Sequence, residues 1–97
     1  MDSIVLSLLI EDDRYGYDIS KEISLRTEGK FEVKEGTLYA VFQRLEKKAY
    51  ISSYYGEHSH GGKRKYYTIT GNGKSYLRSL SAEWKELKQV VDLFMKE

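Results

Sequence analysis

The first apolar residues of the chain recur at the spacing of one helical face: Ile4, Val5, Leu8 and Leu9. This spacing predicts a helix over residues 2–12, whose start Asp2 or Ser3 can cap with a side-chain oxygen. Asp12 and Asp13 interrupt the apolar pattern and are expected to end the helix.

A second, shorter helix is predicted over Tyr17–Arg26, with Ile19 and Ile23 on its apolar side. The tight connection before it contains Gly16, which is available for a positive φ. Residues 28–30 carry a glycine and are expected to end this helix.

A third helix is predicted over Gly36–Lys48, after an extended stretch at residues 31–34. Its apolar face is formed by Leu38, Val41, Phe42 and Leu45. Two short helices joined in this way, the second with a polar and charged outer face, have the outline of a helix-turn-helix.

The pattern then changes to the period of two that is typical of strands. Ile51–Tyr55 and Lys65–Ile69 are rich in β-branched and aromatic residues, and a polar, glycine-rich segment at residues 56–64 separates them. We therefore expect two antiparallel strands with a basic tip, which is a wing.

The last element is predicted to be one long helix with Thr70 as its N-cap. About 25 residues would span roughly 37 Å at 1.5 Å per residue. Its apolar residues form a heptad seam: Leu77, Leu80, Trp84, Leu87, Val91 and Phe94. A small body cannot cover the whole seam, so we expect these residues to form a dimer contact.

The chain of 97 residues fits one compact unit. The predicted fold is mainly α, with a winged helix-turn-helix at residues 1–70 and a dimerisation helix at residues 71–97. The apolar run Ile4–Ile10 is too short to cross a bilayer and resembles no signal peptide. Together with the absence of cysteine, this favours a cytoplasmic protein.

Charge is distributed unevenly although the net charge is only +1. Residues 1–33 carry four basic residues against eight acidic ones, whereas residues 34–69 carry seven against three. The predicted third helix and wing therefore form the basic part of the chain, and a local basic face matters more for contact with phosphates than the total charge.

Catalytic and metal chemistry is not indicated. The chain has no cysteine, and its only histidines, His58 and His60, have Glu57 as the one acidic residue nearby. A zinc site needs three or four ligands. With no glycine-rich phosphate loop and no evident carboxylate pair, we expect no metal, no cofactor and no enzyme activity.

The second helix of a helix-turn-helix places its N-terminal residues in the major groove of DNA. The corresponding candidates are Lys34, Gly36, Thr37 and Tyr39, with Gln43 and Arg44 further along. In the wing, Lys63, Arg64 and Lys65 can reach backbone phosphates or the minor groove. The alternative is that both are merely solvated surfaces.

Trp84 is the only tryptophan and lies in the middle of the seam. It either packs in a helix–helix core or lines, with its copy in a dimer, a cavity for a planar aromatic ligand.

Several segments, in this order, resemble the PadR family of bacterial transcriptional regulators: Tyr15–Ile19, Glu35–Tyr39, Arg44–Glu46, Tyr50–Ser53, Gly61–Thr70 and Trp84. The resemblance implies a homodimer joined through the last helix and the partner's N-terminal helix. It also implies binding to palindromic double-stranded operators, usually as a repressor, and in many members release by a small aromatic effector, as in multidrug-sensing regulators.

The resemblance places the DNA contacts at Lys34, Thr37, Tyr39, Arg44, Lys63 and Arg64, and the effector contact at Trp84. A protein-interaction module is the alternative function, because winged helices can also bind proteins through these surfaces. RNA binding is less favoured, since no aromatic platform for bases is evident in the sequence.

Overall fold

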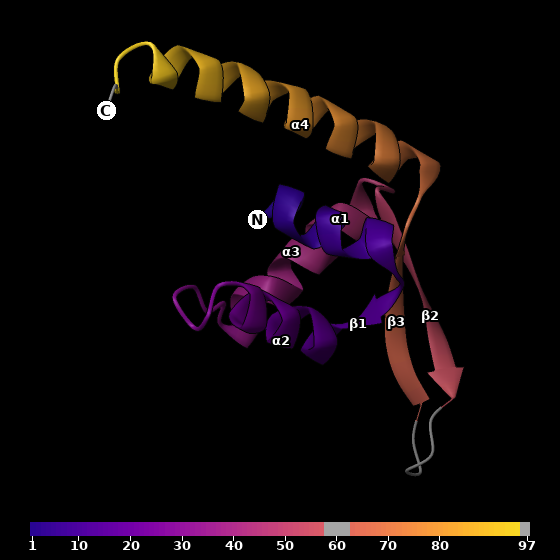
Figure 1. Ribbon diagram of the computed structural model, residues 1–97. Coiled ribbons are helices and arrows are strands. Elements are labelled where there is room, and N and C mark those ends of the chain that lie inside the picture. Colours follow the sequence, from indigo (N-terminus) through magenta and orange to yellow (C-terminus); the bar gives the residue numbers. More distant parts are fainter. Residues whose placement is uncertain (58–62, 96–97) are drawn as a thin grey trace.

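The computed structural model describes residues 1–57 and 63–95 (Figure 1). These residues form, in order, α1 (Asp2–Glu11), β1 (Arg14–Tyr15), α2 (Gly16–Arg26), α3 (Glu35–Lys47), β2 (Ile51–Glu57), β3 (Lys63–Ile69) and α4 (Gly71–Asp92). The predicted winged helix-turn-helix followed by one long helix is confirmed. The histidines and glycines of the predicted wing tip, at residues 58–62, lie outside the described residues.

The sheet is antiparallel and has the strand order β1-β3-β2. The wing strands pair from Ile51↔Ile69 to Glu57↔Lys63 and are longer than predicted. The third strand, β1, was not predicted, because two residues are too short to show a period of two. It pairs Tyr15 with Tyr66 and so joins the start of α2 to the wing.

The core lies between the first three helices and the inner face of the sheet. Phe42 of α3 is at its centre, fully buried, with its ring centroid 4.4 Å from that of Tyr67 on β3. From α1 the core receives Val5, Leu6, Leu8 and Leu9. The predicted apolar face of α1 was therefore partly wrong: Leu6 is buried, whereas Ile4 is 38% exposed.

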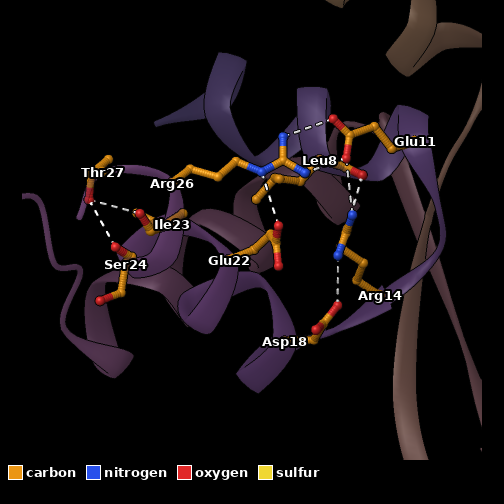
Figure 2. A network of polar contacts seen from close by, with 9 residues as sticks. All are labelled: Leu8, Glu11, Arg14, Asp18, Glu22, Ile23, Ser24, Arg26 and Thr27. Atoms are coloured by element: carbon orange, nitrogen blue, oxygen red, sulfur yellow. Dashed lines mark hydrogen bonds and ion pairs between the residues drawn. The ribbon is translucent and has the colours of Figure 1, made fainter. Parts of the chain in front are cut away.

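Ion pairs and hydrogen bonds connect α1, β1 and α2 (Figure 2). Glu11 accepts hydrogen bonds from Arg14 Nη2 at 3.1 Å and from Arg26 Nη1 at 2.8 Å. Arg14 also binds Asp18, and Arg26 binds Glu22, each at 3.0 Å. The hydrogen bonds from Arg26 lower the pKa of Glu11. The pairs share partners, so they fix the relative orientation of the helices better than isolated surface pairs would.

Two local features differ from what the sequence suggested. Met1 is the N-cap of α1 and no side chain caps this helix; Asp2 lies inside the first turn and binds other helices instead. Gly16 does not have a positive φ; among the described residues only Glu28, Gly29 and Ala49 do. Gly16 is buried at the first position of α2, where another helix approaches closely.

Helix α4 begins as predicted, because the Thr70 side chain accepts a hydrogen bond from the backbone N–H of Gly73 at 3.0 Å. The helix crosses α1 and then continues well beyond the body (Figure 1), which gives the molecule a longest dimension of 54 Å. The outer half of α4 has no covering partner among the described residues of this chain.

Candidate nucleic-acid interface

Helix α3 exposes its N-terminal end and one side to solvent. Lys34 is its N-cap residue, and Leu38, Val41, Phe42 and Leu45 are buried at helical spacing. The opposite side carries the exposed residues Gly36, Thr37, Ala40, Gln43 and Lys47. The sequence-predicted candidates Lys34, Gly36, Thr37 and Gln43 therefore lie together on an open helix surface.

Tyr39 lies at the edge of this surface and is 42% exposed. Its ring meets Phe42 edge to face, with centroids 5.6 Å apart. A Cβ on Gly16 would lie 3.0 Å from the Tyr39 hydroxyl oxygen, so the absence of a side chain at Gly16 leaves room for this ring. Tyr39 thus has a fixed position with its outer edge open.

Arg44 is not simply directed into solvent. Its guanidinium donates two hydrogen bonds to the carboxylate of Asp2 on α1, one from Nη1 at 2.9 Å and one from Nη2. This contact, opposed by partial burial, lowers the pKa of Asp2 to about 2. Arg44 therefore differs from the other α3 candidates in having a carboxylate partner within the chain.

The three basic residues at the start of β3 lie on two faces of the wing, because side chains alternate along a strand. Lys63 and Lys65 share the face of buried Tyr67, and Lys65 Nζ is 3.7 Å from Glu46 Oε1 on α3. Arg64 lies on the outer face, with its guanidinium carbon 4.4 Å from the centre of the Tyr15 ring. The wing lysines, and not Arg64, are therefore on the side of the wing that faces α3.

Glu46 holds the wing against α3. Besides its contact with Lys65, it accepts a hydrogen bond from Ser53 Oγ on β2 at 3.0 Å. The wing and α3 are consequently joined into one surface.

An aromatic row that sequence reasoning missed crosses the outer face of the sheet. Tyr17 stacks on Tyr15 (centroids 6.4 Å apart), Tyr15 meets Tyr66 edge to face (5.6 Å), and Tyr66 stacks on Tyr54 (5.7 Å). The count of nine tyrosines was the available signal. These rings contact one another and so stiffen the wing, and the absence of an aromatic platform for bases stays a prediction.

A groove with a volume of about 650 Å³ separates α1 from α4. Its lining is mainly apolar and comprises Ser3, Ile4, Ser7, Leu77, Leu80, Ser81, Glu83, Trp84 and Leu87. A smaller cavity between α1 and α2, of about 270 Å³, shares Ser3, Ile4 and Ser7 with it. The sequence-predicted ligand residue, Trp84, is thus on a groove wall.

The heptad seam divides into two parts. Leu77 and Leu80 pack against the core of the same chain. The remaining members are exposed: Trp84 by 63%, Leu87 by 54%, Val91 by 38% and Phe94 by 80%. The expectation that the body cannot cover the seam agrees with the structure.

Within residues 1–57 and 63–95, no three His, Asp or Glu side chains lie close enough together to hold a metal ion. His58 and His60 lie outside the described residues. None of the described helices combines the length and the apolar character that crossing a membrane requires.

A helix-turn-helix followed by an antiparallel hairpin, with the second helix exposed beside it, defines a winged-helix protein. A family model described as "Transcriptional regulator PadR-like family" matches residues 5–79. An uncharacterised protein of Lysinibacillus sphaericus is 62% identical over 96 residues, which cover 99% of this chain and 88% of that protein. The chain belongs to the PadR-like family of transcriptional regulators.

Solved structures agree with this assignment. A transcriptional regulator from Clostridium thermocellum has 49% identity and a TM-score of 0.89, over 99% of this chain and 93% of the other. A more distant structure, PadR of Bacillus subtilis in complex with operator DNA, shares the fold. Its TM-score is 0.72 at 23% identity, over 81% of this chain and 45% of that protein.

Proposed function

We propose that this protein is a sequence-specific regulator that binds double-stranded DNA through α3 and the wing. The observation that carries the proposal is the open N-terminal end of α3, on a helix whose C-terminal end is joined through Glu46 to the lysine-bearing face of the wing. The proposed DNA-binding residues are Lys34, Gly36, Thr37, Tyr39, Gln43, Arg44, Lys63, Arg64 and Lys65. The structurally similar Bacillus subtilis PadR has been solved in complex with operator DNA, which supports DNA as the partner.

These residues divide by chemistry. Lys34 and the wing lysines supply charge for phosphates, and the open backbone N–H of Gly36 at the helix start suits a phosphate oxygen. Thr37 and Gln43 can hydrogen-bond to base edges or phosphates. Arg44 would contact the DNA while it is paired with Asp2, and Arg64 would contact it from its position over the Tyr15 ring.

The protein acts as a homodimer through residues 71–97, in which the exposed part of the seam is covered by a second copy. The seam residues proposed for this contact are Leu77, Leu80, Trp84, Leu87, Val91 and Phe94, of which the last four are open in the single chain. A twofold dimer would place two recognition helices about 34 Å apart and so read a palindrome.

The dimer represses transcription in the cytoplasm and is relieved by a planar aromatic molecule that binds beside Trp84. The mainly apolar lining of the α1–α4 groove suits such a ligand. Saturable quenching of Trp84 fluorescence by planar aromatic cations is the expected result. If the Trp84 fluorescence does not respond to a varied panel of such compounds, the Trp84 side chain serves only in packing.

Selection from random-sequence DNA tests the central proposal. Protein of known mass in solution is mixed with the DNA at two salt concentrations, and bound fragments are sequenced. Recovery of a palindrome by a dimer, with affinity that falls steeply with salt, is expected. Sequence-blind binding, or none, would contradict a sequence-specific regulator.

A protein-interaction module is the second candidate, because the exposed apolar end of α4 would also fit a different partner. Sedimentation or light scattering separates the two candidates. A monomer at micromolar concentration would favour the interaction module, and a dimer favours the regulator.

A further inference from the structure

One carboxylate joins three helices at the base of α4. Asp2, in the first turn of α1, accepts hydrogen bonds from Arg44 on α3 and, at 2.7 Å, from the hydroxyl of Tyr76 on α4. Its side chain is only 16% exposed. This acidic residue therefore connects α3 to α4 by side-chain hydrogen bonds.

The Tyr76 side of this junction is itself held firmly. The Tyr76 ring stacks on Tyr50, with centroids 4.2 Å apart and planes 15° from parallel. The backbone N–H of Tyr50 donates to the carbonyl oxygen of Leu45 on α3 at 3.0 Å, and its own carbonyl accepts from Thr70 at 3.1 Å. A change in the position of α4 would therefore act on a tightly packed set of groups.

The junction also borders the α1–α4 groove. Ser3 and Ile4, which follow Asp2, line that groove, and so does Leu77, which follows Tyr76. A molecule or helix that changes the spacing of α1 and α4 at the end of the groove next to Leu77 would also change the spacing of Asp2 and Tyr76. Because Asp2 also binds Arg44, that change reaches α3.

We propose that Asp2 is a positioning residue for DNA binding. Through its hydrogen bonds with Tyr76 and Arg44, it couples the position of α4 relative to α1 to the position of α3. The inference rests on the proposed function and deepens it, because it assigns the path from the groove to the DNA surface. Arg44 is near the C-terminal end of α3, away from the N-terminal residues that approach the bases, and this location suits such a link.

Coupling between two sites is reciprocal, so DNA binding at α3 must also be sensed at the groove. Trp84 is the only tryptophan and lies on the groove wall, which makes its fluorescence the natural reporter. The DNA duplex recovered by selection serves as the probe, and its binding is followed independently by anisotropy of a dye on the DNA.

In the wild-type dimer we expect saturating DNA to change the Trp84 emission. In Asp2→Asn the affinity should fall about fivefold, at the low end of couplings between protein sites. The Trp84 change at saturation should be lost, although the DNA is still bound. Arg44→Gln and Tyr76→Phe each remove one of the hydrogen-bond donors to Asp2, so both variants should lose the change in Trp84 emission as well.

Two controls separate coupling from charge and from weak binding. Asp18→Asn also removes a carboxylate, one that binds Arg14 at 3.0 Å, and should keep the Trp84 response. Lys34→Ala should bind DNA more weakly and still give the full response at saturation. Circular dichroism verifies the fold of each variant.

A full Trp84 response in folded Asp2→Asn would overturn the inference, and so would a wild-type protein that binds DNA without any response. Failure of the wild type to bind any duplex is a different result, because it contradicts the proposed function itself.

Discussion

Tyr39 of α3 lies directly over Gly16 at the start of α2, so that a Cβ at Gly16 would be 3.0 Å from the Tyr39 hydroxyl oxygen and 3.3 Å from Phe42 Cε2. Phe42 is fully buried and cannot yield, whereas Tyr39 is on the edge of the core. The two helices of the motif therefore approach each other at a point where only glycine fits without movement.

Gly16→Ala should lower the free energy of unfolding by about 1 kcal/mol, the low end for overpacking, because Tyr39 must shift. Urea unfolding measures this change. In a Tyr39→Ala background the loss should be smaller, since the nearest atoms are gone. Gly36→Ala, which meets nothing within 4 Å, is the matched control and should not destabilise the protein.

Gly73→Ala should be more damaging, because its Cβ would lie 2.0 Å from the carbonyl oxygen of Tyr50 and backbone must move. We expect a loss of about 3 kcal/mol in urea unfolding, at the upper end for overpacking. Gly71, two residues earlier, has open space around it. Equal losses for Gly71→Ala and Gly73→Ala would contradict the close packing of α4 on Tyr50.

Arg64→Ala should weaken binding to all DNA sequences similarly and reduce the salt dependence by about one phosphate contact. Titrations at several salt concentrations measure both quantities. Arg78→Ala, which removes an exposed arginine on α4, should leave the salt dependence unchanged. If Arg64→Ala behaves in the same way, the side chain serves only to brace Tyr15.

The Asp2 pKa makes stability depend on acid. The hydrogen bonds from Arg44 lower the pKa of Asp2 from 3.8 to about 2. The contribution of this carboxylate to the free energy of unfolding is therefore present above pH 4 and is lost as the pH falls towards 2. After a discount for the solvent around half-exposed Arg44, this loss should be about 1 kcal/mol. Urea unfolding between pH 5 and pH 2 should show it in the wild type.

The matched measurement uses Asp2→Asn. This variant should lack that part of the acid dependence, while the loss due to other carboxylates such as Glu11 remains. Parallel stability curves for the two proteins would show that the Asp2–Arg44 contact contributes nothing to folding.

Much of the site could be predicted because its parts are local in sequence. The exposed face of α3 follows from the helical spacing of its apolar residues, and the Thr70 cap follows from its place before the helix. The role of Gly16 could not be predicted, since its constraint comes from Tyr39, which belongs to another helix. Arg44 was expected to face DNA, and no local pattern indicated a partner on α1.

The sequence by itself determined the order of the helices and wing strands, the basic character of residues 34–69 and the exposed apolar seam, because these depend on spacing along one element. Only the tertiary structure decided the pairing of β1 with β3, which face of the wing is turned towards α3, and the joining of Asp2, Arg44 and Tyr76. The physical reason is the distance along the chain between the partners: Asp2 precedes Tyr76 by 74 residues, and packing alone brings them together.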